Sequence, residues 1–148
     1  MHRTGIWILT IFLVACGGRG YNASGTWQGT ATNQSYPYDS LAMRFYFNDQ
    51  NGSLRGSHCA YLDGSWRYVG TIRGSCSGES AAWRVDASGG YIEVGGSFGG
   101  DRFNGTYRIV AYGSGSLTAS LSLARGGTQS LNLPLEVGVL TRLLEELR

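Results

Sequence analysis

Few side chains in this chain are able to do catalytic chemistry. His58 is the only histidine apart from His2, so a Ser-His-Asp arrangement would depend on it alone. Lysine is absent, which excludes a Gly-x-x-x-x-Gly-Lys phosphate loop. Carboxylate pairs such as Asp39 with Asp49 suit glycoside hydrolysis, but ten acidic residues scattered over predicted turns and outward faces are typical of solvation. We therefore expect no enzyme, no catalytic residue, no metal site and no cofactor.

Cys16 has the most specific local context of any reactive side chain. Arg3 is followed by an apolar run, residues 6–14, that is too short to span a bilayer, and small residues precede Cys16, as in a secretory signal. Leu13-Val14-Ala15-Cys16 resembles the lipobox of bacterial lipoproteins. In that family the cysteine thiol is modified with diacylglycerol, the signal is cleaved before the cysteine and the new N-terminus is acylated. The resemblance implies lipidation of Cys16 with chains such as palmitate; an ordinary secretory signal with a chance cysteine is the alternative.

The lipobox also implies how the chain is divided and where it resides. It places a signal peptide at residues 1–15, a lipidated tether at 16–23 and a single domain at 24–148. Three acyl chains, at about 0.8 kcal/mol per buried methylene, hold a protein on a membrane essentially permanently. In lipoproteins of this kind an Asp after the cysteine often signals retention in the inner membrane. Gly17 occupies that position here, which favours the outer membrane and leaves open on which face of it the domain lies.

Cys59 and Cys76 remain as the thiols of the mature chain if Cys16 carries lipid. An even number of cysteines in an oxidising compartment predicts a disulfide between them, which would close a loop of about seventeen residues and contribute up to roughly 3 kcal/mol. A metal site with His58 is the alternative, but two thiols and one imidazole at this spacing match no familiar zinc pattern. Side-chain alternation puts Cys59 outward and Cys76 inward, so the disulfide requires a bulge or a loop position.

The charge of the chain argues against a nucleic-acid partner. Its twelve basic residues are all arginine and ten residues are acidic, which gives a formal net charge of +2. Removal of Arg3 with the signal leaves a nearly neutral domain, and no basic stripe is visible along the sequence. The length of the mature chain suits one domain with one hydrophobic core.

Apolar residues recur with a period of two through most of the chain, as in strands with one buried face. Leu41, Met43, Phe45 and Phe47 are one example, alternating with mostly polar residues. Turn signals at roughly ten-residue spacing separate the alternating segments and predict an antiparallel meander of eight or nine strands. The last of these strands covers residues 131–137, with Pro134 suggesting an edge position. The turn signals are Asn51-Gly52, Asp63-Gly64, Ser77-Gly78, Ser88-Gly89-Gly90, Gly99-Gly100 and Gly126-Gly127.

The period of the apolar residues changes near the C-terminus. Val139, Leu140, Leu143, Leu144 and Leu147 fall at helical spacing, with charged residues on the opposite side. We predict a short amphipathic helix that buries this stripe on the outside or at the mouth of the sheet. A partner surface is the alternative use of the stripe.

An up-and-down meander of this size removes its exposed edges by closing into a small barrel, so the predicted fold class is all-β. Gly25-Thr26-Trp27 resembles the Gly-x-Trp motif of the calycin group, the lipocalins and their relatives. In that group the Trp closes one end of the barrel and packs under an Arg from a late strand, and a helix follows the barrel. The resemblance implies this role for Trp27, with Arg125 as its partner and Arg108 as the alternative.

The predicted inward face mixes bulky side chains with glycines. An eight-stranded interior of this kind is either filled by side chains or leaves room for one small ligand. Glycines opposite aromatic rings usually accommodate packing, so we expect a filled core. The candidate ligand-lining residues are His58, Phe45, Trp83 and Tyr107, although a lone buried His is more often satisfied by a hydrogen bond than used chemically.

Three classes of function remain. The first is a non-catalytic envelope lipoprotein, anchored to the membrane through its lipid, that acts as a structural or accessory module by contacting another envelope protein. The second is a lipocalin-like carrier of a small apolar molecule. The third is a carbohydrate-binding or inhibitor module that uses exposed aromatic rings as a stacking surface. The candidate rings are Tyr36, Tyr38, Tyr61, Trp66, Tyr91 and Tyr112.

Overall fold

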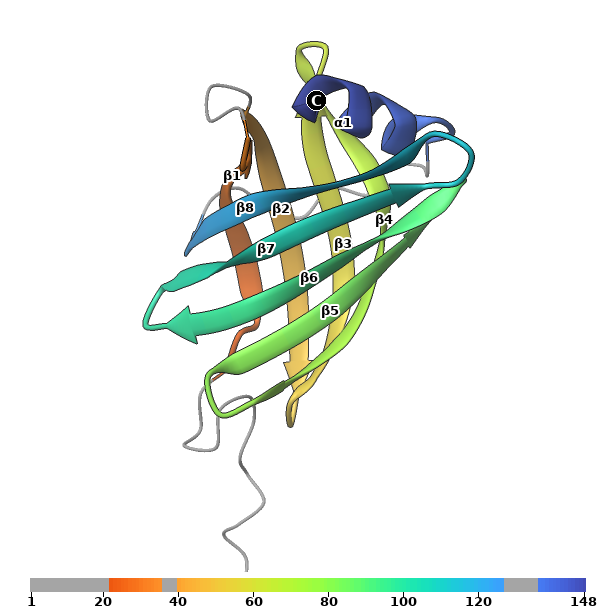
Figure 1. The fold of residues 1–148 in the computed structure, drawn as a ribbon. Helices are drawn as coiled ribbons and strands as arrows, with labels where there is room; N and C mark the ends of the chain where they lie inside the picture. Colours follow the sequence, from red (N-terminus) through yellow and green to blue (C-terminus); the bar gives the residue numbers. More distant parts are fainter. Residues whose placement is uncertain (1–21, 36–39, 127–135) are drawn as a thin grey trace, which may run out of the picture.

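The computed structural model describes residues 22–35, 40–126 and 136–148. Eight antiparallel strands follow one another around a closed barrel, in which each strand pairs with the next and β8 pairs with β1 (Figure 1). The all-β meander and the C-terminal helix predicted from the sequence are confirmed. The elements are β1 (Gly25–Asn33), β2 (Ser40–Gln50), β3 (Ser53–Leu62), β4 (Ser65–Ser77), β5 (Ser80–Ala87), β6 (Gly90–Gly99), β7 (Arg102–Ala111), β8 (Gly115–Arg125) and α1 (Val139–Leu147).

A ninth strand is not needed to close this barrel. The segment predicted to form it, residues 131–137, lies mostly outside the described residues, and Pro134 is among those not described. β1 pairs directly with β8 from Trp27 and Arg125 to Asn33 and Ala119, so the first and last strands leave no open edge between them. Within the described part of the chain, no helix is long and apolar enough to span a bilayer.

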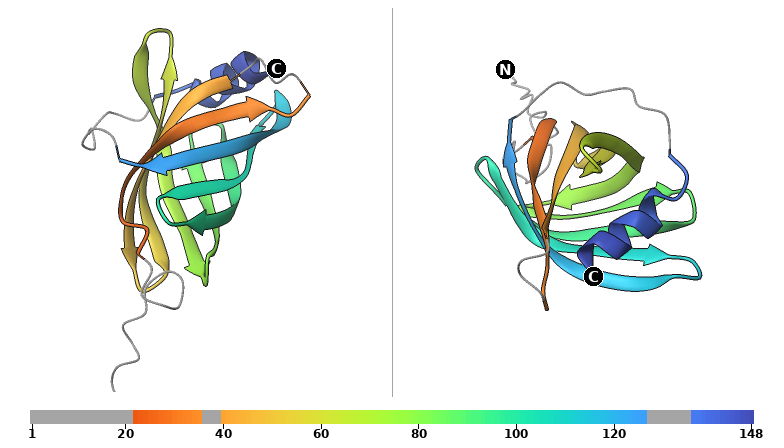
Figure 2. Two further views of the ribbon diagram at one scale, coloured as in Figure 1. Left: turned by 90° about the vertical axis from the view of Figure 1, so that its left-hand side faces the viewer. Right: turned by 90° about the horizontal axis from the view of Figure 1, so that it is seen from above.

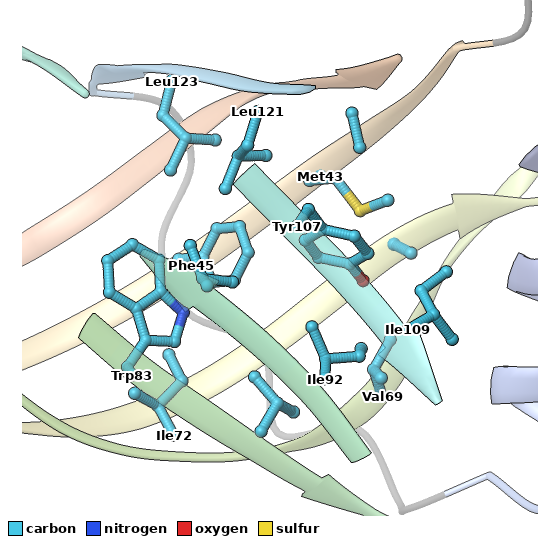
Figure 3. Packing of buried hydrophobic residues seen from close by; sticks show 14 of the residues in the cluster. Met43, Phe45, Val69, Ile72, Trp83, Ile92, Tyr107, Ile109, Leu121 and Leu123 are labelled. Carbon is cyan, nitrogen blue, oxygen red and sulfur yellow. The ribbon is translucent and has the colours of Figure 1, made fainter. Parts of the chain in front are cut away.

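The period-two pattern decides which side chains line the barrel. On β2, Met43, Phe45 and Phe47 alternate with outward residues and are at most 5% exposed. The other strands repeat this alternation, and the inward side chains form one continuous apolar cluster (Figure 3). Full burial of each large apolar side chain contributes roughly 1.5–3 kcal/mol, so this interior is the hydrophobic core of the protein.

The turns have the backbone conformations that their residues predict. Asn51 and Gly52 join β2 to β3 with φ angles of 55° and 89°. Asp63 and Gly64 join β3 to β4 with φ angles of 52° and 82°. Positive φ at both central residues is what a two-residue type I′ hairpin requires, because its twist matches that of the flanking strands. The tight connections therefore follow from local sequence.

Several inward-facing glycines allow the strands to approach closely. A Cβ atom added at Gly29 would overlap the carbonyl oxygen of Ser122, and one added at Gly70 would overlap that of Asp86. The same holds for Gly105, where the overlap is with the carbonyl oxygen of Gly95. Glycine is required at these positions because the sheet bends sharply toward the neighbouring strand. These residues therefore serve barrel closure and do not hold space open for a ligand.

Helix α1 covers one end of the barrel (Figure 2). It packs against β7, β8, β4 and β2, and its five apolar residues are at most 4% exposed and belong to the same cluster as the barrel interior. Polar contacts hold it at three places. Arg142 Nη2 bonds Asp63 Oδ1 at 2.7 Å, Arg148 Nη2 donates to the carbonyl of Ser114 at 2.7 Å, and the Asn33 amide donates to the carbonyl of Leu147. The predicted burial of the stripe at the barrel mouth is therefore confirmed.

Candidate functional site

The opposite end of the barrel holds the pair that the calycin resemblance implies. Arg125 stands opposite Trp27 in the register of β1 and β8, and its guanidinium carbon lies 4.6 Å from the centre of the Trp27 ring. Arg125 also donates from Nε to Asp101 at 2.8 Å and from Nη1 to the carbonyl of Ser24 at 2.8 Å. The Trp27 indole N–H donates to the carbonyl of Ala23 at 2.8 Å. The contact predicted between Trp27 and Arg125 is present, and it covers this end of the core.

The four predicted ligand-lining residues meet inside the barrel. Phe45 stacks on His58 with ring centroids 4.1 Å apart and planes 2° from parallel. Trp83 and Tyr107 approach Phe45 edge-on, with centroids at 5.4 Å and 6.5 Å (Figure 3). They come from β2, β3, β5 and β7, so only barrel closure brings them together. Each is at most 3% exposed.

His58 has a complete set of hydrogen-bond partners. Its Nδ1 lies 2.9 Å from the carbonyl oxygen of Arg44, and its Nε2 lies 2.7 Å from the hydroxyl of Tyr107. Because a carbonyl can only accept, the proton of the neutral ring is on Nδ1, and the Tyr107 hydroxyl donates to Nε2. Both ring nitrogens are therefore occupied by structural bonds.

Burial also keeps this pair from titrating near neutral pH. Desolvation lowers the pKa of His58 to about 4, although the hydrogen bond to the Arg44 backbone opposes the shift. Desolvation raises the pKa of Tyr107 well above its usual value. Both groups are neutral at physiological pH, and neither reaches solvent. The geometry supports a structural role for His58 and gives no path for acid or base catalysis.

Aromatic rings fill the rest of the interior in direct contact with one another. Trp27 lies 4.9 Å from Phe98, which lies 5.0 Å from Phe103, and Phe103 lies 4.9 Å from Trp83. Phe47 lies 4.8 Å from Trp83 and also stacks on Phe45, so it connects this series of rings to the Phe45–His58 stack. Centroid separations of this size correspond to packed rings. The expectation of a filled core agrees with this packing.

Three hollows lined by described residues open to solvent. One of about 550 Å³ lies at the α1 end between Asn33, Leu117 and Arg148.

One polar atom inside the barrel has no hydrogen-bond partner in the described part of the chain. The indole N–H of Trp83 is buried and has no hydrogen-bond acceptor there.

Cys59 is a free thiol that does not face the interior, yet it is fully buried. A bulge between His58 and Cys59 shifts the register with β4, so His58 pairs with Gly70 and Cys59 with Tyr68. Cys59 therefore lies on the outer wall, opposite Arg44 of β2. Desolvation raises the pKa of its thiol to about 11, against the opposing effect of Arg44. A protonated, covered thiol is poorly reactive even in an oxidising compartment.

The predicted Cys59–Cys76 disulfide is wrong. Cys59 pairs with Tyr68, whereas Cys76 lies near the end of β4, where its N–H bonds the carbonyl of Gly52 at 2.8 Å. The eight residues from Tyr68 to Cys76 span roughly 26 Å along an extended strand. A disulfide requires Cα atoms within about 7 Å of each other. A bulge is present between His58 and Cys59, but it shifts the register by one residue only and leaves the two cysteines far apart along the sheet.

The aromatic residues considered as a sugar platform form separate cross-strand pairs. Tyr61 packs edge-on against Trp66 with centroids 5.3 Å apart, and Tyr91 packs in the same way against Tyr112 at 6.1 Å. Tyr112 is 65% exposed and Tyr61 is 42% exposed. The other two candidates, Tyr36 and Tyr38, lie outside the described residues.

Two inward polar residues complete the ends of the barrel: sequence reasoning gave Asn33 no structural role, and it was wrong to count Asp49 among the solvated acidic residues. Asp49 is 6% exposed and accepts from the N–H of Ala23 and the N–H of Gly52, both at 2.9 Å. Asn33 is 4% exposed and bonds the last turn of α1. Both residues fall on inward positions of the alternating pattern of their strands. A polar residue at an inward position is therefore the sequence signal that would identify them.

No family model matches this chain, and no curated protein or solved structure matches it either. The fold and the site therefore stand on the geometry described above. The eight-stranded antiparallel barrel is consistent with a lipocalin-like barrel. Among the described residues, no group of His, Cys, Asp and Glu is arranged to hold a metal ion.

Proposed function

We propose that the protein is a membrane-anchored lipoprotein of the bacterial cell envelope, acylated at Cys16, that acts without catalysis through the outer surface of its barrel. The observation that carries this proposal is the interior filled by contacting aromatic rings. Arg125 and Trp27 cover one end of that interior and α1 covers the other. Because contacting rings occupy the interior, we place the function on the outer wall.

The N-terminal motif supports the membrane localisation in this proposal. Leu13-Val14-Ala15-Cys16 matches every position of a lipobox, and the described chain enters the barrel a few residues later at Ala23. Gly17 in place of an acidic residue favours the outer membrane. In this proposal, the binding partner is another component of the envelope that contacts the outer wall of the barrel.

A Cys16→Ser variant tests the anchor directly. We expect the wild-type chain to incorporate labelled palmitate and to sediment with membranes, and the variant to lose the label and remain unprocessed. Cys59→Ser makes the same atomic change at a free thiol outside the lipobox and should keep both the label and the location. Normal acylation of Cys16→Ser would contradict the lipoprotein assignment.

A carrier of a small apolar ligand is the second candidate, and one observation favours it. The unmatched indole N–H of Trp83 could donate to a ligand atom inside the barrel. Comparing the native and denaturing mass spectra of the chain extracted from its own envelope separates the two functions. We expect one mass under both conditions. A non-covalent adduct that is lost on denaturation would instead support the carrier.

A further inference from the structure

Barrel closure assembles a row of arginines on the outer wall. In the strand registers Arg55 of β3 stands opposite Arg73 of β4, and Arg73 stands opposite Arg84 of β5. The row continues through Glu93 of β6 to Arg108 of β7. All five side chains are exposed. Three like charges on three neighbouring strands are unfavourable for folding, since like charges directly opposite each other destabilise a sheet.

Acidic residues neutralise only the far part of this row. Arg84 Nε bonds Asp86 Oδ1 at 2.9 Å, and its guanidinium lies 3.9 Å from the centre of the Tyr91 ring. Arg108 Nη1 bonds Glu93 Oε1 at 3.0 Å. These two ion pairs fix the carboxylates at the β5–β7 side of the row.

Arg55 and Arg73 are left with uncompensated charge. Within the described residues, neither forms an ion pair with a carboxylate. Arg55 Nη1 donates to the carbonyl of Leu54 at 3.0 Å, which does not neutralise it. Two adjacent guanidinium groups therefore face solvent together, and an anion is the group that would relieve their repulsion.

The surface beside these arginines is shaped and lined for an anion. A hollow of about 270 Å³ lies on the outer wall between Arg73 and Arg84, where Ala82 has too small a side chain to fill it. Glu93 also lines the hollow, but Arg108 binds its carboxylate. The strand positions on either side of Arg55 and Arg73 carry hydroxyl donors, which are Ser53, Ser57, Thr71 and Ser75. Guanidinium groups with hydroxyl donors suit a phosphate group, because arginine binds phosphate oxygens in a bidentate manner.

We propose that Arg55, Arg73 and Arg84 form a docking surface for the phosphodiester headgroups of the anionic membrane to which the chain is tethered. The proposal rests on the membrane anchor proposed above. Charge complementarity selects an anionic surface, and a lipid anchor combined with a basic patch is a known way to hold a domain against such a membrane. The phospholipid class is an anionic phosphodiester such as phosphatidylglycerol.

The entry point of the chain brings this surface within reach of the anchor. The N–H of Ala23 bonds Asp49, and Asp49 stands opposite Leu54, the residue before Arg55. The start of β1 and the β2–β3 and β4–β5 hairpins lie at the same end of the barrel (Figure 1). The six residues from 17 to 22 span at most roughly 20 Å when fully extended. A domain on so short a tether stays close to the headgroups.

The test uses the full chain in neutral maltoside micelles, so that the readout does not depend on whether the anchor is acylated. Short-chain dihexanoyl phosphatidylglycerol is titrated in, and the arginine Nε–Hε resonances are followed by NMR. We expect the signals of Arg55 and Arg73 to shift with this lipid and not with dihexanoyl phosphatidylcholine. Each arginine near an anionic surface strengthens binding about fivefold, so Arg55→Gln with Arg73→Gln should weaken the apparent affinity about 25-fold.

Arg102→Gln is the matched control, since Arg102 is equally exposed but lies on β7, across the barrel from the β3–β4 wall. It should leave the titration unchanged. The proposal is overturned if the neutral lipid shifts the same signals, if the double variant binds as the wild type does, or if inorganic phosphate alone saturates the site at equal concentration. Loss of palmitate labelling without loss of this titration would instead remove the anchor and leave the headgroup site intact.

Discussion

At the scale of single residues, the two polar side chains in the middle of the barrel interior, His58 and Tyr107, form a neutral pair. His58 and Tyr107 are fully buried, and their mutual hydrogen bond and the Arg44 carbonyl satisfy both imidazole nitrogens. Arg125 instead stays at the rim, where it reaches Trp27 and Asp101. A neutral, fully bonded imidazole avoids the high free energy of a buried charge.

The depressed pKa of His58 predicts a loss of stability in acid. The folded state takes up this proton near pH 4, whereas the unfolded chain takes it up near the ordinary value of 6.5. Between these values the unfolded state binds more protons, so the free energy of unfolding falls as pH drops. The contribution is complete above pH 6.5 and lost by about pH 4, and it amounts to roughly 3 kcal/mol. Urea denaturation measured from pH 8 to pH 4 checks it.

His58→Gln is the control for this prediction, because glutamine does not titrate. The variant should be less stable than the wild type at pH 8, since the stacking on Phe45 and one or both ring hydrogen bonds are altered. Its stability should then fall less steeply between pH 6.5 and pH 4 than that of the wild type. Parallel curves for the two proteins would show that His58 does not account for the acid sensitivity.

At the scale of elements, α1 is part of the core and not a free docking face. Its apolar residues share one cluster with the barrel interior, and its polar side chains bond the β3–β4 and β7–β8 hairpins. An amphipathic helix of nine residues is too short to be stable alone in water. Packing on the barrel end therefore supplies its stability, and the helix in turn shields the rings below it.

Leu143→Ala tests this reading of α1. Leu143 is fully buried, so its truncation should lower the free energy of unfolding by about 2–5 kcal/mol, from lost apolar burial and the cavity left behind. Glu145→Ala, on the exposed side of the same helix, should change it by less than about 0.5 kcal/mol. Thermal or chemical denaturation of both variants gives the comparison. Equal effects would mean that α1 does not belong to the core.

At the scale of the whole molecule, the function that we propose lies on the outside of the barrel. The interior is filled, both ends are covered, and an exposed arginine row occupies the wall near the chain entry. The tether and the arginine row would then act together, because the anchor raises the local concentration of headgroups around the row. In this proposal, the membrane that receives the anchor determines which lipid surface the barrel meets.

Gly17→Asp tests how that membrane is chosen. The lipobox resemblance implies that an Asp directly after the lipidated cysteine retains a lipoprotein in the inner membrane. We expect this variant to move from the outer to the inner membrane fraction on a density gradient, with acylation of Cys16 unchanged. Gly18→Asp adds the same charge one residue later and should keep the wild-type distribution. Identical positions of wild type and Gly17→Asp on the gradient would contradict the sorting expectation.

Local patterns in the sequence determined the strands, the turns and the helix of this protein. Side-chain alternation assigns Phe45, Trp83 and Tyr107 to one inner face because the strand period is two. Asn51-Gly52 and Asp63-Gly64 impose tight hairpins because they accept positive φ. The short Gly25-Thr26-Trp27 motif led to the contact with Arg125 only through its resemblance to a family. The strands, the turns and the helix are each specified by residues that are neighbours in the chain.

Only the tertiary structure decided the arginine row. The bulge between His58 and Cys59 changes the register of β3 against β4 beyond it and so places Arg55 opposite Arg73, and no local pattern locates this bulge. Arg55, Arg73 and Arg84 are scattered in the sequence and show no basic stripe there, yet the strand registers place them side by side. The physical reason is that register depends on hydrogen bonds between strands and on how the closed barrel fills its interior, and both are properties of the assembled sheet.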